Sequence, residues 1–185
     1  MQGLHSVRLA MLAMVFLAIW NLPVLAQQPD PQVLDKAAME IRKKNPNVDA
    51  ALLTRDKAVI KATFPVIQAD LTAKGFNDAD VNAAVVTGWK DLRAAPGGVS
   101  SFNAQDFKVM ISKLGKLRIT SKPNGANIDI NALRQDEKTD TAKWLKPGSY
   151  SVLLTKEGFS PEEERRTIVE GENPPITKTL TRRPQ

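Results

Sequence analysis

The side chains that most often carry out chemistry in enzymes are nearly absent from this sequence. The chain has no cysteine, and its single histidine, His5, lies in a hydrophobic leader that we expect to be removed. The remaining chain therefore cannot build a cysteine nucleophile, a histidine base, a thiolate zinc site or a serine–histidine–aspartate triad. Carboxylates or a serine–lysine pair remain possible, but the Asp and Glu residues are typical of solvated faces and helix caps. We expect a protein that is not an enzyme, with no catalytic residues and no cofactor.

One stretch has the spacing of metal ligands. Asp78, Asp80 and Asn82 stand where a calcium-binding loop would place its first ligands. The sixth position would then be Ala83, where the sharp turn needs glycine, and the twelfth would be Trp89, where a bidentate glutamate is required. Capping of a helix N-terminus is a sufficient role for the two aspartates, so we expect no metal site.

The first 26 residues have the three-part layout of a secretory signal peptide. An apolar run of 12 residues, from Leu9 to Trp20, is followed by small residues at Val24 and Ala26. As a helix this run spans about 18 Å, against roughly 30 Å of bilayer hydrocarbon. We expect cleavage between Ala26 and Gln27, with retention as an uncleaved anchor as the alternative. The product would be exported to the periplasm, the cell surface or the medium, and would not span the membrane after cleavage.

The charge balance does not favour a nucleic-acid partner. Lys and Arg number 26 against 20 Asp and Glu, for a formal net charge of +6. Both signs are interspersed along the chain, and aromatic residues make up only 5%, too few for a base-stacking surface. An exported protein of this charge would sooner meet anionic envelope polymers or lipid headgroups, but a mildly basic surface mainly favours solubility and predicts no specific partner.

Between residues 31 and 114 the apolar residues recur with the period of a helix. Four amphipathic segments are predicted, at about 31–44, 49–74, 77–92 and 103–114. Pro65 would kink the second segment or restart it. The pattern predicts a bundle of about four helices, which forms a domain over residues 27–115.

From residue 116 the apolar period changes to two, which is typical of short strands. The alternation predicts a compact all-β domain over residues 116–181, followed by a tail at 182–185. Tyr150 has the parity of the predicted core, whereas the charged run 162–166 is expected to be a solvated turn. Because only Gly115 and Lys116 separate the last helix from the first strand, we expect the two domains to touch. The predicted fold class is α+β, a helical bundle followed by a small sandwich-like β module.

Three segments of the β half occur in the order of a known module: "GKLRITSKPNGANIDI", "LKPGSYSVLLTKEGF" and "RTIVEGENPPITKTL". Together they resemble the PEGA domain family over about residues 115–181, and the helical half is not covered. The turn that names the family reads Pro-Asn-Gly-Ala here, and Thr139-Asp140 stands where the family has Thr-Pro. We therefore expect a longer or differently shaped connection between the first and second of these segments, over residues 131–144. The residues that match the family for backbone reasons are Pro123, Gly125, Ala126, Pro147, Gly148 and Gly158.

The resemblance implies a small β-sandwich-like module of exported or surface proteins, regarded as non-catalytic. It implies binding to an envelope protein or an envelope polysaccharide. We accordingly expect an exported, non-catalytic envelope protein that acts as an interaction module. The alternative is an enzyme, or an enzyme accessory, whose active surface lies in the helical domain.

Trp144 is the aromatic residue whose placement the sequence leaves most open. It has the opposite parity to Leu145, so the two side chains cannot face the same core unless a bulge intervenes. Trp144 therefore either packs against another element, at a domain interface, or presents its ring outward as a sugar-binding platform. A large apolar ring is rarely left exposed, so we expect residues outside its own sheet to cover it.

Overall fold

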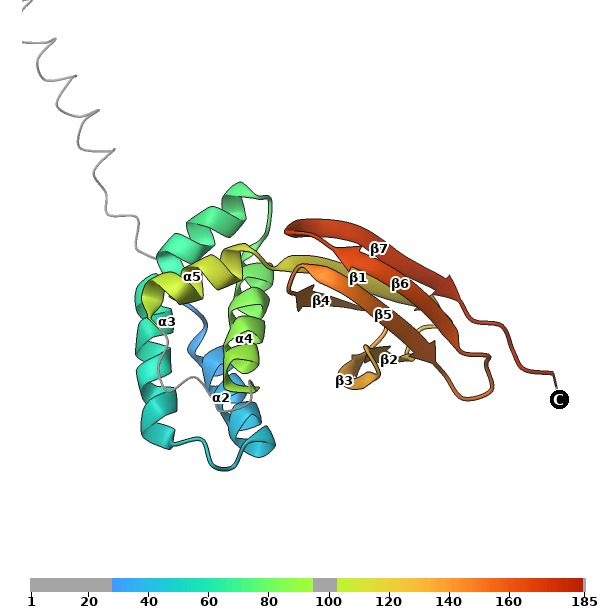
Figure 1. The fold of residues 1–185 in the computed structure, drawn as a ribbon, viewed down its shortest axis with the longest axis horizontal. Helices are drawn as coiled ribbons and strands as arrows, with labels where there is room; N and C mark the ends of the chain where they lie inside the picture. The colour runs from blue at the N-terminus through green and yellow to red at the C-terminus, as the bar shows by residue number, and fades with distance from the viewer. Residues whose placement is uncertain (1–27, 95–102, 185) are drawn as a thin grey trace, which may run out of the picture.

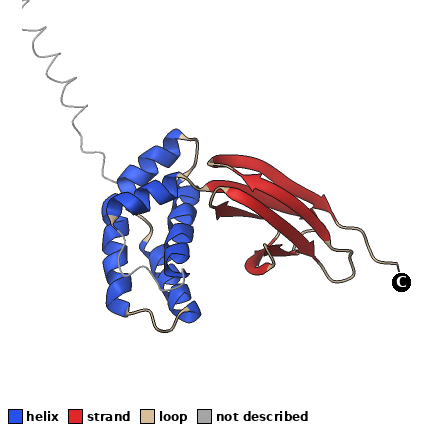
Figure 2. Cartoon of the chain, in the orientation of Figure 1, coloured by secondary structure: helices blue, strands red, loops and turns tan. Residues whose placement is uncertain are grey.

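The computed structural model describes residues 28–94 and 103–184 and has the expected α+β architecture. A group of helices is followed by a β module of two sheets, with little chain between them (Figures 1 and 2). The predicted cleavage site at Ala26 and Gln27 lies outside the described residues, as does the rest of the leader. Within the described ranges, no helix is both long enough and apolar enough to cross a membrane.

The helices begin where the sequence places side chains that can cap them. Asp49 and Asn103 each accept a hydrogen bond from a backbone N–H of the turn that they precede. Asn77 caps its helix in the same way, through the backbone N–H of Asp80. The second helix continues through Pro65 without restarting. The helices are α2 (Pro31–Lys44), α3 (Ala50–Ala73), α4 (Asp78–Ala94) and α5 (Ala104–Ser112).

The β module contains a three-stranded and a four-stranded sheet. The first has the order β4-β1-β7, in which β1 pairs antiparallel with β4 and parallel with β7. The second is antiparallel and has the order β3-β2-β5-β6. The strands are β1 (Gly115–Lys122), β2 (Asn127–Ile130), β3 (Leu133–Lys138), β4 (Thr141–Leu145), β5 (Gly148–Thr155), β6 (Glu162–Ile168) and β7 (Gly171–Thr179).

The prediction of a solvated turn over residues 162–166 is wrong, because this charged run forms most of β6. Its side chains alternate between half-buried and exposed positions, as in any strand with one covered face. On the half-buried side Arg166 forms an ion pair with Glu164, and the Lys178 ammonium lies 3.0 Å from the same carboxylate. Paired charges therefore occupy the half-buried positions of β6, where a strand with one covered face usually has apolar residues.

Each domain has its own apolar core. The helical core gathers around Phe64, Trp89 and Phe107, and the β core lies between the inner faces of the two sheets.

The helical core also contains a carboxylate, which contradicts the expectation that the acidic residues lie on solvated faces or at helix caps. Asp56 of α3 is buried, and accepts hydrogen bonds from Arg93 and Trp89 of α4. A buried polar group is tolerated because these partners satisfy it.

Gly115 lies at the junction where the helical domain gives way to β1. A Cβ atom at this position would stand 2.1 Å from the Val169 carbonyl oxygen and 2.5 Å from Ile168 Cγ2. Because a backbone carbonyl cannot rotate away as a side chain can, we expect Gly115→Ala to lower the free energy of unfolding by about 1–3 kcal/mol. Urea denaturation measures this change. Lys113→Ala, at an exposed position of the same junction, should stay within about 0.5 kcal/mol of the wild type, and equal effects of the two variants would contradict the packing argument.

Candidate functional site

The residues that match the family motif lie in turns of the β module or next to them, and Gly148 is the first residue of β5. Gly125 and Gly158 have φ angles of +75° and +77°, which glycine adopts at little cost. The Ser121 hydroxyl donates to the Pro123 carbonyl at 2.7 Å, and the Ala126 N–H donates to the Thr139 hydroxyl at 2.9 Å. These contacts fix the backbone of the turn. These observations agree with a backbone role for the motif residues, as the sequence analysis expects.

The prediction that Trp144 is covered by residues outside its own sheet is confirmed. The side chain is 4% exposed and belongs to the core of the helical domain rather than to that of the β module. Its ring meets Phe76 edge-on, with the two centroids 4.8 Å apart. The ring cannot serve as an exposed sugar platform, and Trp144 is a residue of the domain interface.

Ion pairs surround this apolar contact and hold the two domains together. Lys116 of β1 stands opposite Trp144 of β4, and its ammonium lies 2.9 Å from the Asp80 carboxylate of α4. Lys74, just after α3, is 2.9 Å from Glu170 in the turn between β6 and β7. The expectation that the two domains touch is therefore confirmed.

These contacts also show what the acidic stretch at the start of α4 does. Asp78 accepts a hydrogen bond from the Gln68 amide at 2.8 Å, and Asp80 forms the ion pair with Lys116. Among the described residues, no group of three or more His, Cys, Asp or Glu side chains could hold a metal ion.

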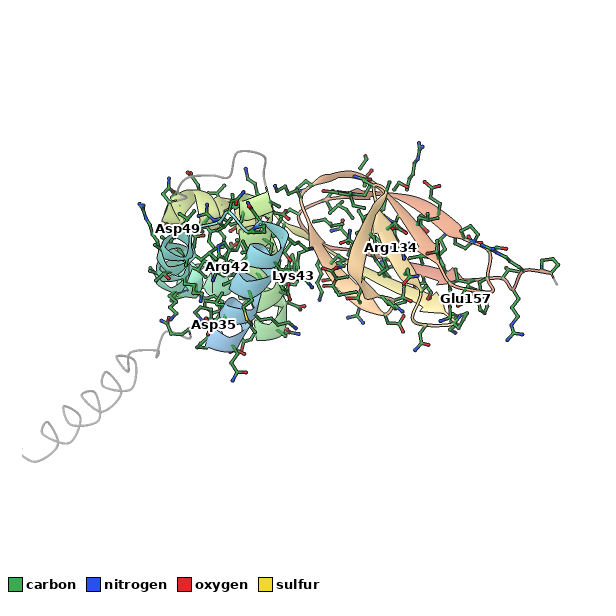
Figure 3. The ribbon with its side chains drawn as sticks, turned by 90° about the horizontal axis from the view of Figure 1, so that it is seen from below. Asp35, Arg42, Lys43, Asp49, Arg134 and Glu157 are labelled. Carbon is green, nitrogen blue, oxygen red and sulfur yellow. The ribbon has the colours of Figure 1, made fainter. Side chains whose placement is uncertain are left out.

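Next to the domain contact lies a cleft of about 740 Å³. The helical domain contributes its wall from the end of α2 and from α4, and the β module contributes the β2–β3 hairpin and the end of β4. Arg134 lines this cleft from the β module, on which Figure 3 labels it. Residues 133–137 line the cleft consecutively. Because successive side chains of a strand point to opposite faces, β3 borders the cleft with its edge rather than with one face.

The charges that line the cleft neutralise one another. The Arg134 Nε atom lies 2.8 Å from the Asp129 carboxylate, which neutralises the charge of the guanidinium group. The lining therefore has no field of a single sign that would select a strongly charged ligand. Each acidic residue of the lining forms an ion pair with a lysine: Glu40 with Lys90, Asp91 with Lys146 at 3.8 Å, Asp136 with Lys44 at 3.2 Å, and Glu137 with Lys143.

Two titratable groups of the cleft have raised pKa values. Burial raises the pKa of the Asp91 carboxyl, and the nearby Lys146 ammonium only partly offsets this effect. Burial also raises the pKa of the Tyr150 phenol, and the negative charge of Asp91 adds to the shift. The Tyr150 hydroxyl donates to the Lys146 carbonyl at 2.9 Å. Perturbed titratable groups that gather in a cleft mark it as the candidate functional site.

The sequence did not predict this site. Asp91 has no distinctive neighbours in the sequence, and Tyr150 has the parity of a core residue although it is only half-buried. No local signal pointed to either residue, because the cleft exists only where the β module meets the helical domain. Of the residues singled out from sequence, Trp144 lines the cleft although its side chain is buried, and Tyr150 lines it although its parity indicated a core position.

The fold and the cleft define a two-domain protein in which a sandwich-like β module is fused to a helical bundle. Comparison with protein families is in accord with this description, since the PEGA domain model matches residues 114–184. The C-terminal part of the chain is thus a PEGA domain, as the resemblance implied, and the helical part lies outside the match. No curated protein matches the chain. The family match is consistent with an extracellular binding module.

Proposed function

We propose that this protein is exported, is not an enzyme, and binds an envelope polysaccharide in the cleft between its helical and PEGA domains. The observation that carries the proposal is the chemistry of the cleft, whose acidic groups are all paired with lysines. Such a lining offers many hydrogen-bond donors and acceptors without a strong net field. It suits a polymer that is rich in hydroxyl groups better than one that is densely charged.

The size and composition of the cleft support this proposal. Its volume of about 740 Å³ lies within the range of roughly 300–1,000 Å³ that is usual for ligand sites. Asn131, Gln135 and Thr87 add uncharged polar groups to the lining, and Tyr150 adds an aromatic ring with a hydroxyl at its edge. Hydrogen bonds to the paired ions would contribute more than bonds between neutral groups.

The second candidate, an enzyme, rests on Asp91 of α4. Its raised pKa suits a general acid, whereas the Lys44 ammonium lowers the pKa of Asp136 on the opposite wall. Glycoside hydrolysis needs such a pair of carboxyl groups with different pKa values. Release of sugar from the polymer would distinguish this second function from binding alone.

The proposal is tested by retention of the protein on isolated peptidoglycan and on purified surface polysaccharide, with release of reducing sugar followed in parallel. We expect the wild type to be retained on one of these polymers without hydrolysing it. Asp91→Ala combined with Gln135→Ala should weaken retention by at least about tenfold, because both walls of the cleft then lose a hydrogen-bonding group. Lys61→Ala, an exposed change on α3 outside the cleft, should leave retention unchanged.

Two results would contradict this proposal. If the double variant were retained as strongly as the wild type, the cleft would not be the binding site. If sugar were released, and Asp91→Asn abolished the release, the protein would be a glycoside hydrolase, which is the second candidate function.

A further inference from the structure

β6 forms one edge of the four-stranded sheet. Its inner side pairs with β5 through consecutive residues, from Gly148 opposite Ile168 to Leu154 opposite Glu162, without a bulge. Among the described residues, no strand pairs with its outer side. A regular edge of this kind can accept another strand unless its side chains prevent it.

The charges of β6 are ordered so that the strand complements itself. Its first five residues read Glu-Glu-Glu-Arg-Arg, from Glu162 to Arg166. When two copies pair antiparallel about Glu164, Glu163 of each copy stands opposite Arg165 of the other. In the same register, Glu162 stands opposite Arg166. Cross-strand pairs of opposite charge stabilise a sheet, whereas like charges directly opposite each other destabilise it.

The exposure of these side chains fits the same register. Glu163 and Arg165 are exposed and point to one face, where they could pair with a second copy without moving away from a core. Glu164, which would lie at the two-fold axis, is already neutralised by Arg166 and Lys178. The buried Nε of Arg166 has no hydrogen-bond acceptor in the described structure, and Glu162 of a second copy would stand opposite this residue.

We propose that the protein forms a two-fold symmetric homodimer in which β6 of one copy pairs antiparallel with β6 of the other. Charged side chains on an edge strand usually prevent pairing with other strands. Here their order makes a second copy of the same strand the complementary partner, and such a symmetric interface closes at two subunits. The cleft borders β3, at the opposite edge of the same sheet, so dimerisation would leave it open. The proposal does not depend on what the cleft binds.

The oligomeric state can be measured by sedimentation velocity, with the protein in the form that the cell produces. We expect the wild type to dimerise reversibly as its concentration rises, and less strongly at high salt, because the complementary Glu163 and Arg165 side chains are exposed. Glu163→Arg sets arginine against arginine, and Arg165→Glu sets glutamate against glutamate. Each single variant should therefore raise the dissociation constant by at least about tenfold.

An equimolar mixture of the two variants supplies the decisive comparison. In the mixed dimer every altered residue meets an opposite charge, so the two monomeric variants should associate with each other. The double variant, which carries both changes in one chain, should also dimerise. Glu157→Arg makes the same charge change outside β6, at a residue that Figure 3 labels, and should leave dimerisation unchanged. A wild type that stays monomeric at every concentration, dimeric single variants, or a mixture that does not associate would each overturn the proposal.

Discussion

Asp56→Ala is expected to lower the free energy of unfolding by about 3–5 kcal/mol, the usual cost of breaking a buried ion pair. Asp56 and Arg93 are each 2% exposed. The carboxylate accepts a hydrogen bond from Arg93 Nε at 2.6 Å and another from the Trp89 indole N–H at 2.8 Å. The substitution removes the counter-charge of a buried guanidinium and also the acceptor for the indole. Urea denaturation, followed by circular dichroism, measures the loss.

Two comparisons show whether burial is the cause of this loss. Asp35→Ala breaks an exposed ion pair with Lys57, of 2.6 Å, and should change stability by no more than about 1 kcal/mol. Replacing both buried partners, with Asp56→Leu and Arg93→Met in one chain, should recover most of the lost stability, because neither charge then remains buried. If Asp56→Ala cost no more than Asp35→Ala, the pair would not stabilise the helical domain as we infer.

Trp144→Ala should lower the free energy of unfolding by at least about 3 kcal/mol, as large-to-small changes in a core do. Trp144 is a residue of strand β4, but its indole ring lies in the core of the helical domain, against Phe76. Its removal would leave a cavity at the contact between the domains. We therefore also expect the unfolding transitions of the two domains to separate, so that fluorescence and circular dichroism no longer coincide. Trp144→Phe keeps a ring at the interface and should cost less.

An exposed apolar residue of the β module provides the control for Trp144. Leu133 is 70% exposed, and Leu133→Ala should remain within about 0.5 kcal/mol of the wild type. If Trp144→Ala were equally mild and also abolished retention on polysaccharide, the ring would be a ligand platform, in conflict with its burial.

Much of the secondary structure follows from the sequence, because the determinants are local. Apolar residues with a period of 3.6 predicted the helices, and capping side chains such as Asn103 predicted where a helix begins. The change to a period of two predicted the β module, and short motifs such as the turn around Gly125 carry its resemblance to the PEGA family. These signals depend on residues only a few positions apart, so they do not require knowledge of the tertiary structure.

The tertiary structure decided which faces are buried and which residues meet. The charged run of β6 forms a strand where a solvated turn was expected, and Lys178 of another strand helps to make this arrangement stable. Asp56 could not be distinguished by sequence from a solvated acid, because Arg93 lies 37 positions further along the chain. The cleft brings Lys44 and Asp136 together across 92 positions. A carboxylate is exposed, buried in an ion pair or placed in a cleft according to which distant segment packs against it, because the free energy of a charge depends on its solvent and its partner rather than on its neighbours in sequence.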